Sequence, residues 1–284
     1  MAVKKIGRML KGNLIICFTS PRIYIALILC AILFQQIENP VRILCAQTGY
    51  SISPWLYPHL TALYYIQNII VLGAVLIFCD APFIKNNTSY VMIRMGRNKW
   101  FASQILYIMV MSAVYIGLLY LISILLLLPY VGPETGWGKI IGTLAQTDAA
   151  AQIGGVMLDY QMLLDYSPWE ALSVTCGMSW MIISFTGLLI MFFNMFGNHY
   201  LGAAAGAMVS FTPYFARIFS DMYAGYYIAP PTWMSVTIFG RTGASPYPTI
   251  PYAVCFLASG IVLLIFGSYK RLKHQTFDTS VVMG

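Results

Sequence analysis

Charged residues are scarce in this chain, and their scarcity argues against a soluble protein. Only 9% of the 284 residues are charged, whereas 59% are hydrophobic. An ordinary soluble domain carries about 25% charged residues, which help to cover its surface. The outer surface of this chain must therefore face something other than water, and lipid is the default candidate.

Motifs for catalysis, nucleotide binding and metal binding are also missing. The chain contains no GxxxxGK[ST] phosphate-binding loop and no HExxH zinc-protease motif. Its six cysteines have neither CxxC nor zinc-ligand spacing, and its three histidines lie far apart in the sequence. We therefore expect this chain to have no enzymatic activity, no metal, no cofactor and no disulfide framework of its own.

The long apolar segments predict an all-α membrane protein with six transmembrane helices. A membrane helix needs about 20 mostly apolar residues. No charged residue occurs between Glu170 and Arg217, a stretch too long for one crossing. Turn-forming residues at 194–199 predict a tight helical hairpin in its middle. The predicted crossings are residues 23–36, 60–78, 100–128, 171–193, 200–219 and 252–269.

The positions of Lys and Arg predict that both termini lie in the cytoplasm. Cytoplasmic segments of membrane proteins carry an excess of basic residues. With the N-terminus inside, most of the 16 Lys and Arg residues fall on the inner side. The basic residues are spread between apolar segments and do not form one patch, so the net charge of +7 does not indicate nucleic acid. The exceptions, on the outer side, are Arg42, Lys139, Arg217 and Arg241.

Residues 1–21 read as an amphipathic helix that precedes a single domain of residues 22–284. Apolar residues recur every three or four positions on one face, and basic residues share another. Such a helix lies in the plane of the inner membrane interface, where its bases reach anionic head groups of the lipid bilayer. Pro21 then ends it. The alternative is a simple basic flank that fixes orientation. The predicted anchoring residues are Lys4, Arg8 and Lys11.

The inner loop between the second and third crossings is the most informative stretch. Its apolar and basic residues fall at helical spacing close to the membrane. A short helix here could dock on a cytoplasmic partner, with Arg supplying directional hydrogen bonds. The alternative is that the basic residues only follow the positive-inside rule and contact lipid phosphates. The candidate contact residues are Tyr90, Ile93, Arg94, Arg97, Lys99 and Trp100.

The layout resembles that of the permease subunits of type-two ABC exporters. The shared features are the basic amphipathic N-terminus, six crossings, cytoplasmic ends, and the segment Arg94-Met-Gly-Arg97-Asn-Lys99-Trp100 at the start of the third crossing. The resemblance covers the layout of essentially the whole chain. At the residue level it depends on this segment and on the N-terminus.

The resemblance implies a function and a set of partners. The chain would be a multi-pass permease of a bacterial cell membrane that works as a homodimer or beside a similar permease. A separate ATPase subunit would hydrolyse ATP and move the coupling loop at about residues 87–100. The cargo would be amphipathic or apolar: a peptide, a lipid-like molecule or a drug. In this family the loop before the last crossing often re-enters the membrane. Whether residues 220–251 do so stays open at this stage.

Polar and small residues within the crossings have structural and functional interpretations. Gln67 and Asn68 either line a transport pathway or form hydrogen bonds between helices. Gly202 and Gly206 form a GxxxG match that predicts close helix packing, within one chain or between two.

Two other functions remain as alternatives. No Asp, Glu, Lys or Arg falls near the middle of a predicted crossing. Ion-coupled carriers usually need such groups, so this distribution disfavours a secondary transporter. The other alternative is a membrane-embedded assembly or sensor protein that transports nothing.

Overall fold

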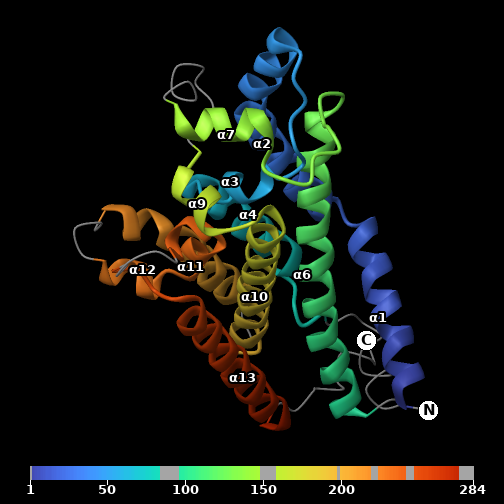
Figure 1. Ribbon diagram of the computed structural model, residues 1–284. Coiled ribbons are helices and arrows are strands. Elements are labelled where there is room, and N and C mark those ends of the chain that lie inside the picture. The colour runs from blue at the N-terminus through green and yellow to red at the C-terminus, as the bar shows by residue number, and fades with distance from the viewer. Residues whose placement is uncertain are drawn as a thin grey trace.

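The computed structural model describes residues 2–83, 96–147, 158–196, 199–218, 223–240 and 246–274. Within these ranges the chain is all-helical and holds no β-strand, as predicted. One isolated bridge joins Ile52 to Val131, so the segments that follow α2 and α6 lie together. Figure 1 shows α6 beside α10, α1 along the lower part of α6, and the short helices α3, α7 and α9 toward the upper end.

The helices follow one another in a simple order along the chain. Their bounds are α1 Ala2–Thr19, α2 Pro21–Thr48, α3 Tyr57–Leu60, α4 Tyr64–Phe78, α6 Arg97–Leu127, α7 Gly138–Gln146, α9 Tyr160–Asp165, α10 Pro168–Asn194, α11 His199–Ile218, α12 Ala224–Ile228, the 3-10 segments η1 Pro230–Met234 and η2 Val236–Ile238, and α13 Ile250–His274.

Four of the described helices are long and apolar enough to cross a membrane. They are α2, α6, α10 and residues Ile250–Lys273 of α13. Large apolar side chains are exposed along them, including Ile28 at 57% and Leu263 at 69%. A soluble monomer rarely exposes contiguous faces of this kind. The chain therefore has the exterior of a membrane-embedded protein.

The second and fifth predicted crossings correspond to α4 and α11, which differ from the other four. α4 has only 15 residues, a length of about 22 Å that is shorter than a bilayer core. α11 has 20 residues, but it is interrupted by polar residues and does not reach the apolarity of the four spans. The structure thus provides four clear spans, and six crossings stay a prediction.

The first crossing extends well beyond its predicted end at residue 36. Ser20 caps the start of α2, and Gly49 in the left-handed conformation ends it after Thr48. The predicted crossing stopped at Gln36, but the polar residues that follow continue the helix. Glu38 lies inside it, fully buried against α6. Glu38 therefore lies within a helix whose predicted crossing ended before it.

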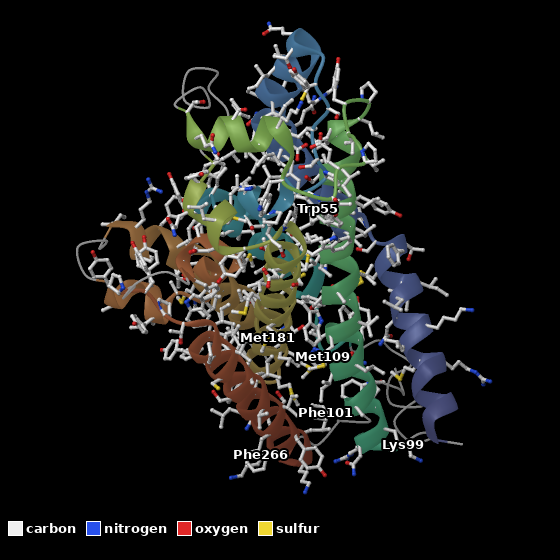
Figure 2. All side chains as sticks on the ribbon, viewed as in Figure 1. Trp55, Lys99, Phe101, Met109, Met181 and Phe266 are labelled. Atoms are coloured by element: carbon white, nitrogen blue, oxygen red, sulfur yellow. The ribbon has the colours of Figure 1, made fainter. Side chains whose placement is uncertain are left out.

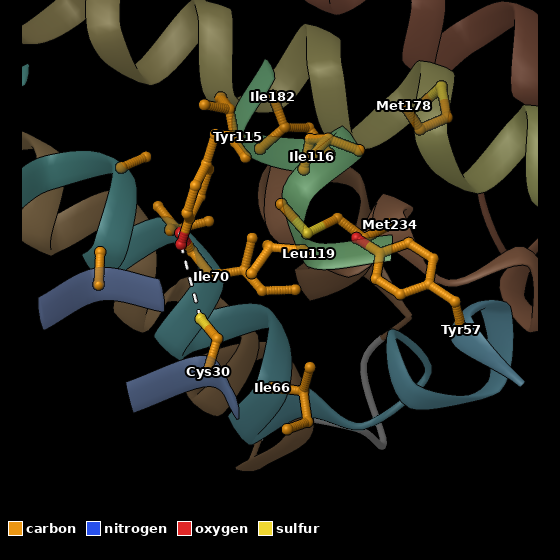
Figure 3. Close-up of a cluster of buried hydrophobic side chains, with 14 of the residues drawn as sticks. Cys30, Tyr57, Ile66, Ile70, Tyr115, Ile116, Leu119, Met178, Ile182 and Met234 are labelled. Carbon is orange, nitrogen blue, oxygen red and sulfur yellow. Dashed lines mark hydrogen bonds between the residues drawn. The ribbon is translucent and has the colours of Figure 1, made fainter. Parts of the chain in front are cut away.

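The central helices are α4 and α10. α4 packs between α2, α10 and α11, and most of its side chains are buried. Tyr115 of α6 reaches into this core: its hydroxyl lies 3.5 Å from the Cys30 thiol of α2 and donates to the Ile70 carbonyl of α4 at 3.3 Å. Figure 3 shows this meeting of three helices. By contrast, α13 packs chiefly on α10 and leaves most of its surface exposed.

The predicted hairpin between α10 and α11 is confirmed, since α10 ends at Asn194 and α11 begins at His199. The Asn194 side chain donates to the carbonyls of Cys79 at 2.8 Å and Ala81 at 2.6 Å. It also accepts from the Gly202 amide at 3.1 Å. One amide side chain therefore links the end of α4 to both arms of the hairpin.

The GxxxG match packs within the chain. A Cβ atom on Gly202 would lie 2.6 Å from the Ile190 carbonyl oxygen of α10. A Cβ atom on Gly206 would lie 2.8 Å from a methyl group of Val75 in α4. Both glycines therefore allow α11 to approach its neighbours closely.

α1 is a helix over Ala2–Thr19 that packs against the first half of α6, and its amphipathic, interfacial character stays a prediction. The Ser103 hydroxyl lies 3.2 Å from the Met9 sulfur, within hydrogen-bond distance. Figure 1 shows α1 running beside α6. Helix packing alone does not define the membrane plane, so the in-plane position stays a prediction.

Candidate functional site

Basic residues gather at one end of the helical body. Phe101 near the start of α6 contacts Tyr269 near the end of α13, with ring centroids 5.9 Å apart. The Arg271 guanidinium lies over the Phe196 ring at 4.8 Å, next to the α10–α11 turn. In Figure 2, Lys99 and Phe266 lie near this end and Trp55 lies far from it. We call this the basic end, and its exposed cations include Arg97, Lys99, Lys270, Arg271 and Lys273.

The predicted partner-docking residues lie partly at this basic end. Arg97 and Lys99 are exposed in the first turn of α6. Trp100 is only 1% exposed and belongs to the core. α1 packs on this part of α6, so the Trp100 indole is not presented to a separate subunit. Tyr90, Ile93 and Arg94 lie outside the described residues.

The predicted anchoring residues of the N-terminus are all on α1. Arg8 and Lys11 are exposed, and Lys4 lies within the helix. This arrangement is compatible with a contact to lipid head groups.

A polar cavity of about 320 Å³ lies away from the basic end. α4 and α13 begin near it, and α11 ends at it, whereas the opposite ends of these helices lie at the basic end. Gln67, one of the two predicted pathway residues, lines the cavity. The lining residues are Ala62, Tyr64, Gln67, Asp159, Pro213, Arg217, Tyr226, Thr232, Ser235, Thr237, Ile238 and Tyr247.

Gln67 supplies the amide side chain of the cavity wall. Its side chain is 3% exposed, and its Nε2 donates to the Thr61 carbonyl at 2.8 Å. Its Oε1 has no hydrogen-bond partner within the described part of the chain. Asn68 is equally buried but does not line the cavity. The structure therefore separates the two predicted pathway residues.

The segment before α13 forms one wall of the cavity. η1 is buried, and the carbonyl of its last residue, Met234, accepts from the Thr61 hydroxyl at 3.3 Å. Ser235 and Thr237 share a hydrogen bond of 2.6 Å between their hydroxyls. The Trp233 indole donates to the Tyr226 carbonyl at 2.8 Å. This segment, for which the sequence analysis left re-entry open, therefore packs into the helical body.

A cation and an anion flank the more exposed part of the cavity. The Arg217 guanidinium lies over the Tyr64 ring at 4.7 Å, which holds it in place. Asp159 caps α9 by accepting from the Gln161 amide at 2.9 Å. The Tyr226 and Tyr247 rings meet edge to face, with centroids 5.0 Å apart. Burial raises the pKa of Tyr247, so its hydroxyl stays neutral and remains a hydrogen-bond donor.

A series of hydrogen bonds connects four short segments that lie between the long helices in the sequence. The Ser53 hydroxyl donates to the Trp137 carbonyl at 2.7 Å, and the Trp137 indole donates to the Tyr166 carbonyl at 3.0 Å. The Tyr166 hydroxyl in turn donates to the Phe239 carbonyl. We call Ser53, Trp137, Tyr166 and Phe239 the outer belt. It joins segments that are far apart in sequence into one layer.

Glu38 is a buried carboxyl group that the sequence analysis placed outside the helices. One carboxylate oxygen accepts from the Ser123 hydroxyl of α6 at 2.7 Å, and the other has no partner within the described residues. Arg42 follows one turn later in α2. The available signal was the spacing of Glu38 and Arg42, which fits one helical face. No group of three or more potential metal ligands occurs within the described residues.

Comparison with known proteins gives no family for this chain. No protein-family model, curated protein or solved structure matches it.

Proposed function

We propose that this chain is the membrane subunit of an ATP-driven transporter of the type-two ABC exporter kind. The observation that carries the proposal is the polarity of the helical body. Its exterior is apolar, a cluster of exposed cations lies at the basic end, and the polar cavity lies away from that end. Such a body suits a cytoplasmic partner at the basic end and a cargo at the cavity.

The energy would come from a separate ATPase subunit. The chain itself contains no phosphate-binding loop. Arg97 and Lys99 would contact the ATPase together with the preceding loop, and α6 would carry the movement into the core, where Tyr115 joins α2 and α4. The permease would act with a second copy or a similar chain, with six crossings and both ends in the cytoplasm.

The first test is whether the adjacent reading frame encodes a P-loop ATPase, and the second is co-expression of that ATPase with this chain. We expect the two proteins to purify together and the double variant Arg97→Glu/Lys99→Glu to reduce capture by about tenfold or more, because charge reversal at a docking surface removes directional contacts. Lys139→Glu reverses an exposed cation on α7 and should leave capture unchanged. If the purified chain alone moved cargo down an ion gradient without ATP, the proposal would be wrong.

A second candidate, an ion-coupled carrier, is favoured by Glu38 alone. A buried carboxyl group within a helix long enough to span the membrane is a potential proton-binding site. Glu38→Gln keeps the size and an acceptor for Ser123 but cannot release a proton. An ATP-driven permease should keep its transport rate in this variant, whereas a proton-coupled carrier should lose it. Transport into vesicles with ATP, and with a pH gradient alone, distinguishes the two.

A further inference from the structure

Gln67 brings a buried amide side chain to the wall of the cavity. The Gln67 amide uses Nε2 on Thr61, and this bond fixes which end of the amide accepts. Its Oε1 is left without a partner in the described part of the chain, in a side chain that is 97% buried. A buried acceptor without a partner is costly.

The two opposite charges beside the cavity favour a ligand that itself carries one negative and one positive group. Arg217 offers the edges of a guanidinium whose face lies on Tyr64, and such edges suit a carboxylate. One carboxylate oxygen of Asp159 accepts the hydrogen bond that caps α9, and the carboxylate as a whole lies next to the cavity. A multiply charged phosphate ligand would meet Asp159 at a cost, whereas a zwitterion pairs with both residues.

The size and walls of the cavity narrow the class further. A volume of about 320 Å³ lies at the small end of ligand pockets, which range over about 300–1,000 Å³. Tyr64, Tyr226 and Tyr247 provide aromatic walls, and Ser235 and Thr237 provide hydroxyl groups. A ligand in which amide groups alternate with small side chains would match this mixture of polar and aromatic lining.

We propose that the cavity binds a short zwitterionic peptide. Its carboxylate pairs with Arg217, and its amino group is attracted by Asp159. As a site for cargo this inference rests on the proposed function and narrows the substrate class. The binding itself is a property of this chain alone.

Three related probes test the proposal by calorimetric titration of the purified full-length chain in lipid nanodiscs. Trialanine carries both charges, trialanine amide lacks the carboxylate, and N-acetyltrialanine lacks the amino group. We expect trialanine to bind about tenfold or more tightly than the amide, because one charge-assisted hydrogen bond is lost. Arg217→Gln should weaken the binding of trialanine by a similar factor. In this variant trialanine and trialanine amide should therefore bind with about the same affinity.

Matched variants separate recognition from folding. Asp159→Asn preserves a cap for α9 and should selectively weaken trialanine relative to the N-acetyl probe. Lys139→Gln removes an exposed cation outside the cavity and should change no affinity. Thermal unfolding of each variant shows whether the fold is retained.

Several results would overturn the inference. The first is that trialanine does not bind at concentrations up to about 10 mM. The second is that the wild-type chain binds trialanine and trialanine amide with equal affinity. The third is that Arg217→Gln lowers the affinity for trialanine and for its amide by the same factor. The titration needs no ATPase subunit. Failure of peptide binding would therefore leave the permease proposal standing, and failure of ATPase capture would leave the peptide site standing.

Discussion

His59 is a buried imidazole held in its neutral form. It is 1% exposed in α3, its ring meets Trp137 edge-on at 5.2 Å, and its Nε2 has no partner within the described residues. Burial lowers the pKa of His59 from 6.5 to about 4. The unfolded chain therefore takes up a proton at a higher pH than the folded chain does.

This difference predicts a loss of stability at acid pH. The contribution of neutral His59 is fully present above about pH 6.5 and falls as the pH drops toward about 4. At about pH 5 the loss amounts to about 2 kcal/mol. Thermal unfolding in detergent at about pH 7.5 and about pH 5 measures it, and His59→Phe should flatten the dependence. An unchanged dependence in His59→Phe would assign it to other groups.

Asn194 is the second residue with a large predicted effect. Asn194→Ala removes the donor to the Cys79 and Ala81 carbonyls and the acceptor for the Gly202 amide. We expect a loss of about 3 kcal/mol, because buried backbone groups lose their partners. Denaturant or thermal unfolding measures it. Asn98→Ala, at an exposed position of α6, should cost less than about 0.5 kcal/mol. Equal effects of the two variants would contradict the role assigned to Asn194.

At the scale of the element, the close packing of α11 predicts that two glycine-to-alanine substitutions have opposite effects on stability. The amino-acid composition of the helices alone would not predict this difference. Gly202→Ala places a methyl group 2.6 Å from the Ile190 carbonyl oxygen, so α11 must shift, at a cost of about 1–3 kcal/mol. Gly117→Ala, in a helix position with nothing within 4 Å, should instead stabilise α6 by about 0.5–1 kcal/mol. Melting temperatures that move in the same direction would refute this assignment.

The elements also show which features the sequence made predictable. The apolar runs located α6, α10 and α13 well, because a span needs length and hydropathy that are visible in a local window. Turn formers located the α10–α11 hairpin for the same local reason. The end of α2 was missed because Glu38 is stabilised by Ser123 of α6, a contact 85 positions away in sequence.

The cavity was only partly predictable. Gln67 stood out as a polar residue in an apolar segment, and it lines the cavity. Arg217 was noted only as a charge near a helix end. Asp159 and the hydroxyl groups of Ser235 and Thr237 lie in loops or short 3-10 turns, where no periodicity announces a shared surface. Their convergence depends on tertiary packing.

At the scale of the whole molecule, the distribution of cations predicts a topology that labelling can test. In a background with the native cysteines replaced by alanine, Lys139→Cys and Lys99→Cys each add one exposed thiol. With the basic end in the cytoplasm, an impermeant maleimide added to intact cells should label the position-139 variant and spare the other until the cells are lysed. The reverse pattern would invert the proposed orientation.

The outer belt bears on how the molecule would meet large binding agents. Its hydrogen bonds run in series from Ser53 through Trp137 and Tyr166 to Phe239. The four loops are therefore linked to one another and restrict each other's movement. An antibody fragment that grips any one of them would immobilise all four. Antibody fragments raised against different loops of this face should therefore restrict the same movement, whichever of the four loops they bind.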